Sequence, residues 1–258
     1  MSGISGVGGY SNLNSYYSAL SSGSRINSAK DGAAELSILN KEDSQTRGFK
    51  AGSENLEAAK SVTNIADGAL EGVTDYLQRM KELAVKASNG LLANDDKKAI
   101  QSEIDQIKEG IENISSSTNY NGIKLLDGSN PSMEIVSDGQ GTTHDITNVS
   151  STLETLGLKD FDVTGSFDIG AIDKALETVS NGRTQIGAQA NGLESAFNYN
   201  SIASYNTTAA KSRLGDTEYG EYVSKLQKET NLNTYKIMMQ KKKQENDATN
   251  IQRLMTSI

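Results

Sequence analysis

Apolar and small side chains recur along the first half of the chain at alternating steps of three and four residues. This spacing puts them on one face of an α-helix and is typical of a coiled-coil seam. No proline interrupts residues 33–89, so the pattern predicts one helix of about 80 Å, at about 1.5 Å per residue, with one buried stripe. The seam consists of Ala59, Val62, Ala66, Ala69, Val73, Tyr76, Met80, Leu83 and Ala87, widened by Leu70, Leu77 and Ala84.

A second seam follows a predicted helix break at Asn89-Gly90. The acidic pair Asp95-Asp96 stands at its start, where negative charge favours the helix dipole. Because the connection between the two helices is short, we expect the second helix to fold back antiparallel to the first. The seam consists of isoleucines spaced by four and three, namely Ile100, Ile104, Ile107, Ile111 and Ile114.

Residues 119–170 change from helical to β-like patterning. Runs of β-forming residues are bounded by the turn dipeptides Asn121-Gly122, Asp127-Gly128 and Asp138-Gly139, which are typical of hairpins. We expect one or two short hairpins and a polar loop. Such a segment forms a small outboard module without a large core of its own.

Helical patterning returns after this segment and continues to the C-terminus. From Asp216 to Ile258 the apolar stripe is poorer, so we expect helicity there to depend on a partner. The better stripe comes first, with small residues that permit close helix approach, and consists of Ile172, Ala175, Val179, Gly182, Ile186, Gln189, Leu193 and Ala196.

Helical segments at both ends with a β-like segment between them require the two ends to pair with each other. The predicted fold class is therefore mainly α. We expect an elongated antiparallel helical, coiled-coil rod built from both terminal regions, with a small β-hairpin-containing insert in the middle.

The composition agrees with thin helical packing and excludes several kinds of function. Hydrophobic residues make up 35% of the chain and aromatic residues 5%, which is little material for a wide core. The formal net charge of −8 argues against general nucleic-acid binding. No apolar run approaches the length needed to cross a bilayer, so no membrane insertion is expected. The opening MSGISGVGGYSN has neither a basic nor an apolar signal region, so no cleaved signal peptide is expected.

The chain lacks the residues from which common metal and catalytic sites are built. There is no cysteine, and His144 is the only histidine. A single histidine without cysteine makes neither a structural zinc site nor a metalloprotease helix. We therefore expect no metal, no cofactor and no enzymatic activity. Lys241-Lys242-Lys243 is interpreted as a solvated helix face.

Several stretches of the chain resemble bacterial flagellin, in the order and spacing of that family. The first is the polar joint between two predicted helices, and the others lie on the predicted seams and turns. They are LSSGSRINSAKDGAA (20–34), IADGALEGVTDYLQRMKELAVKASNG (65–90), AIQSEIDQI (99–107), NYNGIKLLDG (119–128), ALETVSNGRTQIGAQANGLESAF (175–197) and SRLGDTEYGEYVSKL (212–226).

The resemblance implies a structural subunit of the bacterial flagellar filament, which self-assembles through helical rod contacts to support motility. It implies that residues 1–32 and 214–258 form inner filament-core helices and a connector, that residues 33–128 and 171–213 form a helical rod domain, and that residues 129–170 are a short variable surface insert.

The resemblance also implies partners and a location. The partners are further copies of the chain or other flagellins, a flagellar export chaperone and the filament cap. The location is the extracellular flagellum, reached through the secretion apparatus of the flagellum itself without a cleaved signal peptide.

The joint between the first two helices is the first candidate contact site. Gly23 is expected to end the first helix, and Ser28 with Asp31 is expected to form a capping box before the helix that begins near Ala33. Polar side chains between them are expected to project from the joint, and the resemblance implies that neighbouring subunits touch there. The expected connector residues are Arg25, Asn27, Lys30 and Asp31.

A second candidate site lies on the first two rod helices, at Gln78, Arg79, Leu83 and Glu103. In relatives these positions contact an animal innate immune receptor of the Toll-like class, and the same surface packs between subunits. Because Leu83 lies on the predicted seam, packing within the rod is the preferred interpretation. Receptor recognition is then a secondary property.

Three alternatives stay open beside an ordinary filament subunit. The segment before Leu20 is short and rich in Gly and Ser, and the ending KIMMQKKKQENDATNIQRLMTSI departs from the family. The chain could therefore be a minor or junction subunit that needs a major flagellin. It could instead serve as a ligand of a host Toll-like receptor. An enzyme displayed on a rod is the third alternative, but residues 129–170 lack clustered catalytic side chains.

Overall fold

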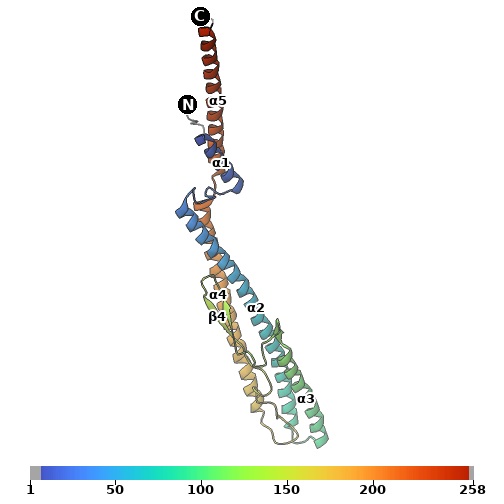
Figure 1. Ribbon diagram of the computed structural model, residues 1–258. Coiled ribbons are helices and arrows are strands. Elements are labelled where there is room, and N and C mark those ends of the chain that lie inside the picture. Colours follow the sequence, from blue (N-terminus) through green and yellow to red (C-terminus); the bar gives the residue numbers. More distant parts are fainter. Residues whose placement is uncertain (1–6, 256–258) are drawn as a thin grey trace. The chain divides into compact units, whose positions relative to one another are not determined.

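The structure is a computed structural model that describes residues 7–255, in which five helices and two strand pairs follow one another (Figure 1). The predicted fold class, mainly α with a small β-containing middle, is confirmed. The outermost parts of the predicted inner segments, residues 1–6 and 256–258, lie outside the described residues. The elements are α1 (Val7–Ser22), α2 (Ala33–Ala87), α3 (Asn94–Ser117), β1 (Asn119–Tyr120), β2 (Ile123–Lys124), β3 (Ser132–Val136), β4 (Thr143–Thr147), α4 (Gly170–Gly215) and α5 (Tyr219–Met255).

The chain divides into two compact units. Unit 1 comprises residues 1–44 and 206–258, and unit 2 comprises residues 45–205. The boundary between residues 44 and 45 lies within α2, and the boundary between residues 205 and 206 lies within α4. The domain limits implied by the resemblance stay a prediction.

In unit 2, α2 contributes most of the seam that its periodicity predicts. Ala69 is only partly buried, and Tyr76 is 38% exposed, with its ring against Gly110 of α3. The stripe is centred on the neighbouring Leu77, which is fully buried, so Tyr76 falls at its edge. The buried residues of this seam are Ala59, Val62, Ala66, Leu70, Val73, Leu77, Met80, Leu83, Ala84 and Ala87.

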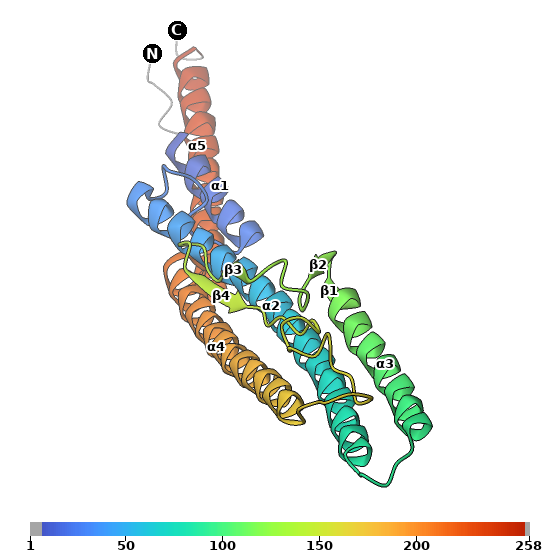
Figure 2. The ribbon, with the colours of Figure 1, turned by 90° about the horizontal axis from the view of Figure 1, so that it is seen from below.

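Helix α3 folds back along α2, as the short connection predicts (Figure 2). Asp95 and Asp96 lie in its first turn, and Asp96 Oδ2 accepts a hydrogen bond of 3.2 Å from the backbone N–H of Ala93. The middle isoleucines of the predicted seam are buried in the main core, while Ile100 and Ile114 pack at its edge.

Helix α4 runs antiparallel to α2 within unit 2. Three ion pairs between the two helices agree with this antiparallel direction, because their residue numbers rise along α2 as they fall along α4. Such half-exposed pairs each contribute about 0–1 kcal/mol, so the apolar seam between the helices supplies most of the stability. The pairs are Lys60 with Glu194, Asp67 with Arg183 at 2.8 Å, and Lys81 with Asp173 at 2.6 Å.

The segment between α3 and α4 does not form an outboard module, so that expectation is wrong. Ile146 of β4 is buried in a cluster with Leu56 and Ala59 of α2 and Leu193 of α4. A two-stranded hairpin is too small to form a core of its own. The loop that follows β4 likewise buries its apolar side chains in the main core of unit 2. The core residues from this loop are Leu156, Leu158, Phe161 and Val163.

The turn of the β3–β4 hairpin rests directly on the backbone of α2. A Cβ atom at Gly48 would lie 2.6 Å from Gly139 Cα, and a Cβ atom at Gly52 would overlap Ser137 O. On the other side, the buried side chain of Asn200 in α4 donates a hydrogen bond of 2.6 Å to Ser137 O. The hairpin is therefore clamped between two helices.

In unit 1, α1 packs along the first part of α5. The rings of Tyr16 and Tyr222 meet edge to face with centroids 5.9 Å apart, and Thr217 Oγ1 donates to Ala19 O at 3.2 Å. Every residue of α5 from Thr234 to Arg253 is exposed. The first part of α5 therefore packs against α1, whereas the side chains from Thr234 to Ile251 face solvent in the described part of the chain.

Candidate assembly surfaces

The joint between α1 and α2 is tied to the joint between α4 and α5. Gly23 has φ +71°, so it ends α1 in the left-handed conformation that glycine favours. The backbone N–H of Arg25 donates to Gly215 O at 2.8 Å, and that of Thr217 donates to Gly23 O at 2.9 Å. Backbone hydrogen bonds therefore hold the α1–α2 joint and the α4–α5 joint of unit 1 together.

Arg25 is exposed at the joint and is also bonded to its own chain. Its Nε donates a hydrogen bond of 2.6 Å to Leu214 O at the end of α4. A basic side chain at a helix C-terminus bonds the last carbonyl groups and complements the helix dipole. This bond to a distant segment could not be predicted from the local sequence.

Asp31 organises the rest of the joint. Its Oδ2 accepts hydrogen bonds from Ser28 Oγ at 2.8 Å, Ser28 N at 2.9 Å and Asn27 N at 3.2 Å. These bonds, that of the Ser28 hydroxyl above all, lower the pKa of Asp31. Helix α2 begins only at Ala33, so the predicted capping box is wrong, and Ser28 and Asp31 close a loop that precedes the helix.

The remaining connector side chains face solvent. Asn27, Lys30 and Asp31 are exposed, although Asn27 Nδ2 also donates to Ser24 O at 2.8 Å. Together with α1 they line a cleft of about 560 Å³ in unit 1, to which α1 contributes Asn14, Ser15 and Ser18. This cleft is a polar surface that a neighbouring molecule can reach.

Acid is expected to loosen this joint. Because folding lowers the pKa of Asp31, the carboxylate stabilises the loop above the ordinary aspartate pKa of about 3.9, and the contribution is lost as the pH falls through the lowered value. Nuclear magnetic resonance shifts of the Asn27 and Ser28 amides between pH 2 and pH 6 measure this. In Ser28→Ala the midpoint should rise, because the largest cause of the shift is removed, and an unchanged midpoint contradicts the assignment.

The second predicted site lies across α2 and α3 in unit 2. Arg79 donates to Glu103 Oε1 from Nη2 at 2.6 Å and from Nε at 2.9 Å, and to Glu82 Oε2 at 2.9 Å. The pKa of the Arg79 guanidinium is raised, and the hydrogen bond to Glu103 is the main cause. Gln78 is exposed beside this network, while Leu83 is only 2% exposed. The structure therefore places three of the four residues on the surface and Leu83 in the seam.

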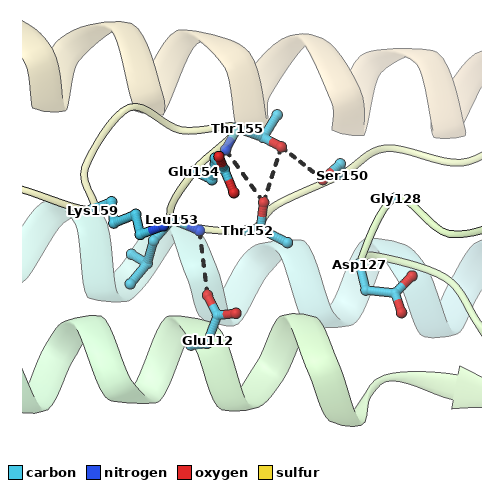
Figure 3. Close-up of a pocket in the computed structure, with 9 residues that line it drawn as sticks. All are labelled: Glu112, Asp127, Gly128, Ser150, Thr152, Leu153, Glu154, Thr155 and Lys159. Atoms are coloured by element: carbon cyan, nitrogen blue, oxygen red, sulfur yellow. Dashed lines mark hydrogen bonds between the residues drawn. The ribbon is translucent and has the colours of Figure 1, made fainter.

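A cleft of about 610 Å³ lies between α3 and the loop after β4 (Figure 3). Its hydroxyl groups bond to one another, with Thr155 Oγ1 2.9 Å from Ser150 Oγ and 3.0 Å from Thr152 Oγ1. Glu112 Oε2 accepts a long bond of 3.4 Å from Leu153 N. No histidine or cysteine lines the cleft, so no activated nucleophile is assembled there. Its other lining residues are Asp127, Gly128, Glu154 and Lys159.

The remaining sequence candidates offer no chemical site. Within the described part of the chain, no three His, Cys, Asp or Glu side chains are placed to hold a metal ion. His144 lies opposite Ile135 in the β3–β4 hairpin. None of the helices between residues 7 and 255 has both the length and the apolar character that a membrane crossing requires.

Two surface features escaped the sequence reasoning. The Gly48-x-x-x-Gly52 spacing on α2 signals a close backbone approach, but it does not say which segment approaches. The uncharged stretch from Ser195 to Ala210 carries exposed aromatic residues on α4. Both signals are visible in the sequence, but only the structure shows which segments lie against these residues and which of their side chains are exposed.

Comparison with known families assigns both helical regions. Residues 8–131 match the model of the bacterial flagellin N-terminal helical region. Residues 169–251 match the model of the bacterial flagellin C-terminal helical region. Between them lies the segment that contains the β3–β4 hairpin.

Individual relatives agree with these matches. A flagellin of Halalkalibacterium halodurans is 38% identical over 206 residues, which cover 77% of this chain and 76% of that protein. The phase 2 flagellin of Salmonella abortus-equi is 34% identical over 221 residues, which cover 83% of this chain and 44% of that protein. The chain thus spans most of the first relative and less than half of the second.

A solved structure agrees as well. The crystal structure of Bacillus cereus flagellin superposes with a TM-score of 0.51 at 27% identity, covering 57% of this chain and 88% of the other. A putative flagellar hook-associated protein from Vibrio parahaemolyticus shares the fold, with a TM-score of 0.60 at 18% identity over 72% of this chain and 100% of the other.

Proposed function

Because the chain belongs to the bacterial flagellin family and is a structural subunit of the flagellar filament, we propose that it assembles by burying the second half of α5 against helices of neighbouring copies. Among the described residues, the longest run of exposed helical positions lies in this half of α5. The exposed α5 segment, residues 234–251, is the observation that carries the proposal.

Exposed apolar side chains in this segment provide the driving force. Tyr235, Ile237, Met238 and Met239 are each more than half exposed. Full burial of one such side chain contributes about 1.5–3 kcal/mol. A helix without a buried face is marginal in water, so packing against neighbours would also stabilise the helix itself.

The joint of unit 1 is the second proposed contact. Arg25 helps to hold the α1–α2 joint against the end of α4. Asn27, Lys30 and Asp31 are exposed and can contact a neighbouring subunit. This division gives the four connector residues two roles. Arg25 positions the joint, and the other three meet the adjacent subunit.

Further partners are proposed from the family to which the chain belongs. An export chaperone would cover the exposed α5 segment before assembly, and the filament cap would receive the chain after it passes through the flagellar secretion apparatus. A host receptor of the Toll-like class is a lesser candidate. Gln78, Arg79 and Glu103 offer it polar contacts, whereas Leu83 is buried.

A seeded assembly experiment tests the proposal on the full chain. The purified protein is expected to stay monomeric alone, to extend filament seeds in electron micrographs, and to gain circular dichroism at 222 nm on assembly. Met238→Asp should lower incorporation at least about tenfold, which corresponds to about 1.4 kcal/mol per contact. Gln227→Asp adds the same charge at an exposed polar position of α5 outside this segment and should incorporate like the wild type.

The outcomes separate the open alternatives. Incorporation only into seeds of another, major flagellin favours a minor or junction subunit. If the wild type enters no filament, alone or beside a major flagellin, the subunit assignment fails. Equal incorporation of Met238→Asp and Gln227→Asp would show that the exposed α5 segment is not the contact.

A further inference from the structure

Methionine is the only residue type in this chain that carries sulfur. The sequence has six methionines and no cysteine, so a thioether is the sulfur group that an oxidant can attack. The oxidant has to reach the sulfur atom directly, and the close-packed interior of a protein excludes it. The burial of each methionine therefore decides which thioethers can react.

Among the described side chains, the exposed methionines are two neighbours in α5. Met238 is 63% exposed and Met239 is 54% exposed. Met80 is fully buried in the main core of unit 2, and Met133 is partly buried against that core. The side chains of Met1 and Met255 lie outside the described part of the chain. The reactive sulfur of the described residues is thus concentrated in the exposed α5 segment.

This pair of methionines covers a wide part of the α5 surface. Successive residues of an α-helix point about 100° apart, so the two thioethers occupy adjoining sectors. Tyr235 lies three and four residues before them, a spacing that makes side chains neighbours on a helix, and it is also 63% exposed. The two sulfur atoms therefore belong to the apolar surface that the proposed filament contact would bury.

We propose that Met238 and Met239 form a peroxide-sensitive modification site, at which oxidation of the thioethers to sulfoxides prevents the exposed α5 segment from packing in a filament. The inference rests on the proposed function as a filament subunit. Oxidation turns a flexible apolar side chain into a polar one. A sulfoxide oxygen that is buried against a neighbour without a hydrogen-bond donor loses its water and weakens the contact.

The modification needs a hydroperoxide as its second reactant. The lone pair of the methionine sulfur attacks one oxygen of hydrogen peroxide, so that an S–O bond forms and the O–O bond breaks. The proton of the attacked oxygen passes to the departing hydroxide, which leaves as water. Sulfur is oxidised by two electrons and the peroxide is reduced. Methionine sulfoxide reductases, one for each sulfoxide epimer, reverse the change, so the site can be reset.

Assembly is expected to protect the pair from oxidation. In the separate chain both thioethers face solvent, whereas the proposed contact covers them with helices of neighbouring copies. Peroxide should therefore act on a subunit before it is incorporated. Met80 serves as an internal reference, because the core of unit 2 shields it in both states.

Peptide mapping by mass spectrometry tests where the oxidation occurs. The full chain is treated with hydrogen peroxide, and the sulfoxide fraction of each methionine is followed in time. In the separate chain Met238 and Met239 should oxidise at least about tenfold faster than Met80, since packed atoms exclude the reagent. In preformed filaments their rates should fall towards that of Met80. Equal rates for the three residues in the separate chain would overturn the proposal.

Seeded assembly tests what the oxidation does. Incorporation of peroxide-treated full chain into filament seeds is divided by incorporation of the same chain without treatment. For the wild type this ratio should fall at least about tenfold, because a buried sulfoxide lacks a hydrogen-bond partner. Treatment of the oxidised chain with both sulfoxide reductases should restore it.

Matched variants assign the effect to the pair. Met238→Leu combined with Met239→Leu keeps apolar side chains of similar volume and removes both thioethers. Peroxide should leave the incorporation of this variant unchanged relative to its own untreated sample. Met133→Leu removes a thioether outside α5 and should stay as sensitive as the wild type. If the double variant enters no filament, the reductase experiment on the wild type decides.

The results separate this site from the filament function. The site is overturned if wild type that is oxidised at both positions still incorporates normally, or if the double leucine variant loses as much as the wild type. It is also overturned if the reductases regenerate both thioethers without restoring incorporation. In these cases the filament function stands. If untreated wild type neither forms filaments nor enters seeds, the filament function falls, and the proposed site falls with it.

Discussion

Replacing Gly52 by alanine is expected to destabilise unit 2 by about 2–4 kcal/mol, although alanine is the better helix former. A Cβ atom at this position would overlap Ser137 O and lie 2.8 Å from Asp138 N. These are backbone atoms, and the bond from Asn200 holds Ser137 O in place. The hairpin turn can give way only by losing that buried hydrogen bond, which costs about 1–3 kcal/mol.

Gly68→Ala is the matched control for this prediction. Gly68 lies in the same helix, and a Cβ atom there would meet no other atom within 4 Å. Alanine should therefore stabilise the protein by about 0.5–1 kcal/mol through helix propensity alone. Urea unfolding followed by circular dichroism measures both variants. Midpoints that shift equally and in the same direction would contradict the clamped hairpin.

Leu77→Ala is expected to lower the free energy of unfolding by about 2–5 kcal/mol. Leu77 is fully buried in the main core of unit 2, which α2, α3 and α4 build together. Close-packed surroundings relax only partly around a deleted side chain, so a cavity remains. Val85 lies on the exposed side of α2, and Val85→Ala should change stability by no more than about 0.5 kcal/mol.

Amide hydrogen exchange is the better measurement for Leu77→Ala, because it reports on the amides of each unit separately. Exchange should accelerate in the unit 2 segments of α2, in α3 and in the unit 2 segment of α4. Unit 1 amides should keep their rates. Faster exchange of equal size in both units would instead show that unit 2 is not an independent cooperative unit.

The helices and their buried stripes could be predicted from the sequence. The three-and-four spacing around Leu77 and the isoleucines around Ile107 both lie in the core where the pattern places them. The breaks at Gly23 and at Asn89-Gly90 also lie where helices end. These predictions succeed because helix periodicity and termination depend on residues a few positions apart.

The errors share a physical cause. The capping box expected at Ser28 and Asp31 did not account for the bond from Arg25 to Leu214, which is far away in the sequence. The middle segment was expected to lie outside the core, but Ile146 and Phe161 are buried among helices that other parts of the chain supply. In each case a distant backbone or side chain provides the partner, and local pattern carries no information on that partner.

The sequence by itself therefore determined the secondary structure, the seams and the family of this protein, because each depends on local spacing or on motifs that can be compared directly. The tertiary structure decided what the glycines at 48 and 52 accommodate, what Asn200 holds, and that the loop after β4 is buried in the core of unit 2. Those features arise only when segments far apart in the chain are brought together, and the free energy of that packing belongs to pairs of segments rather than to either one alone.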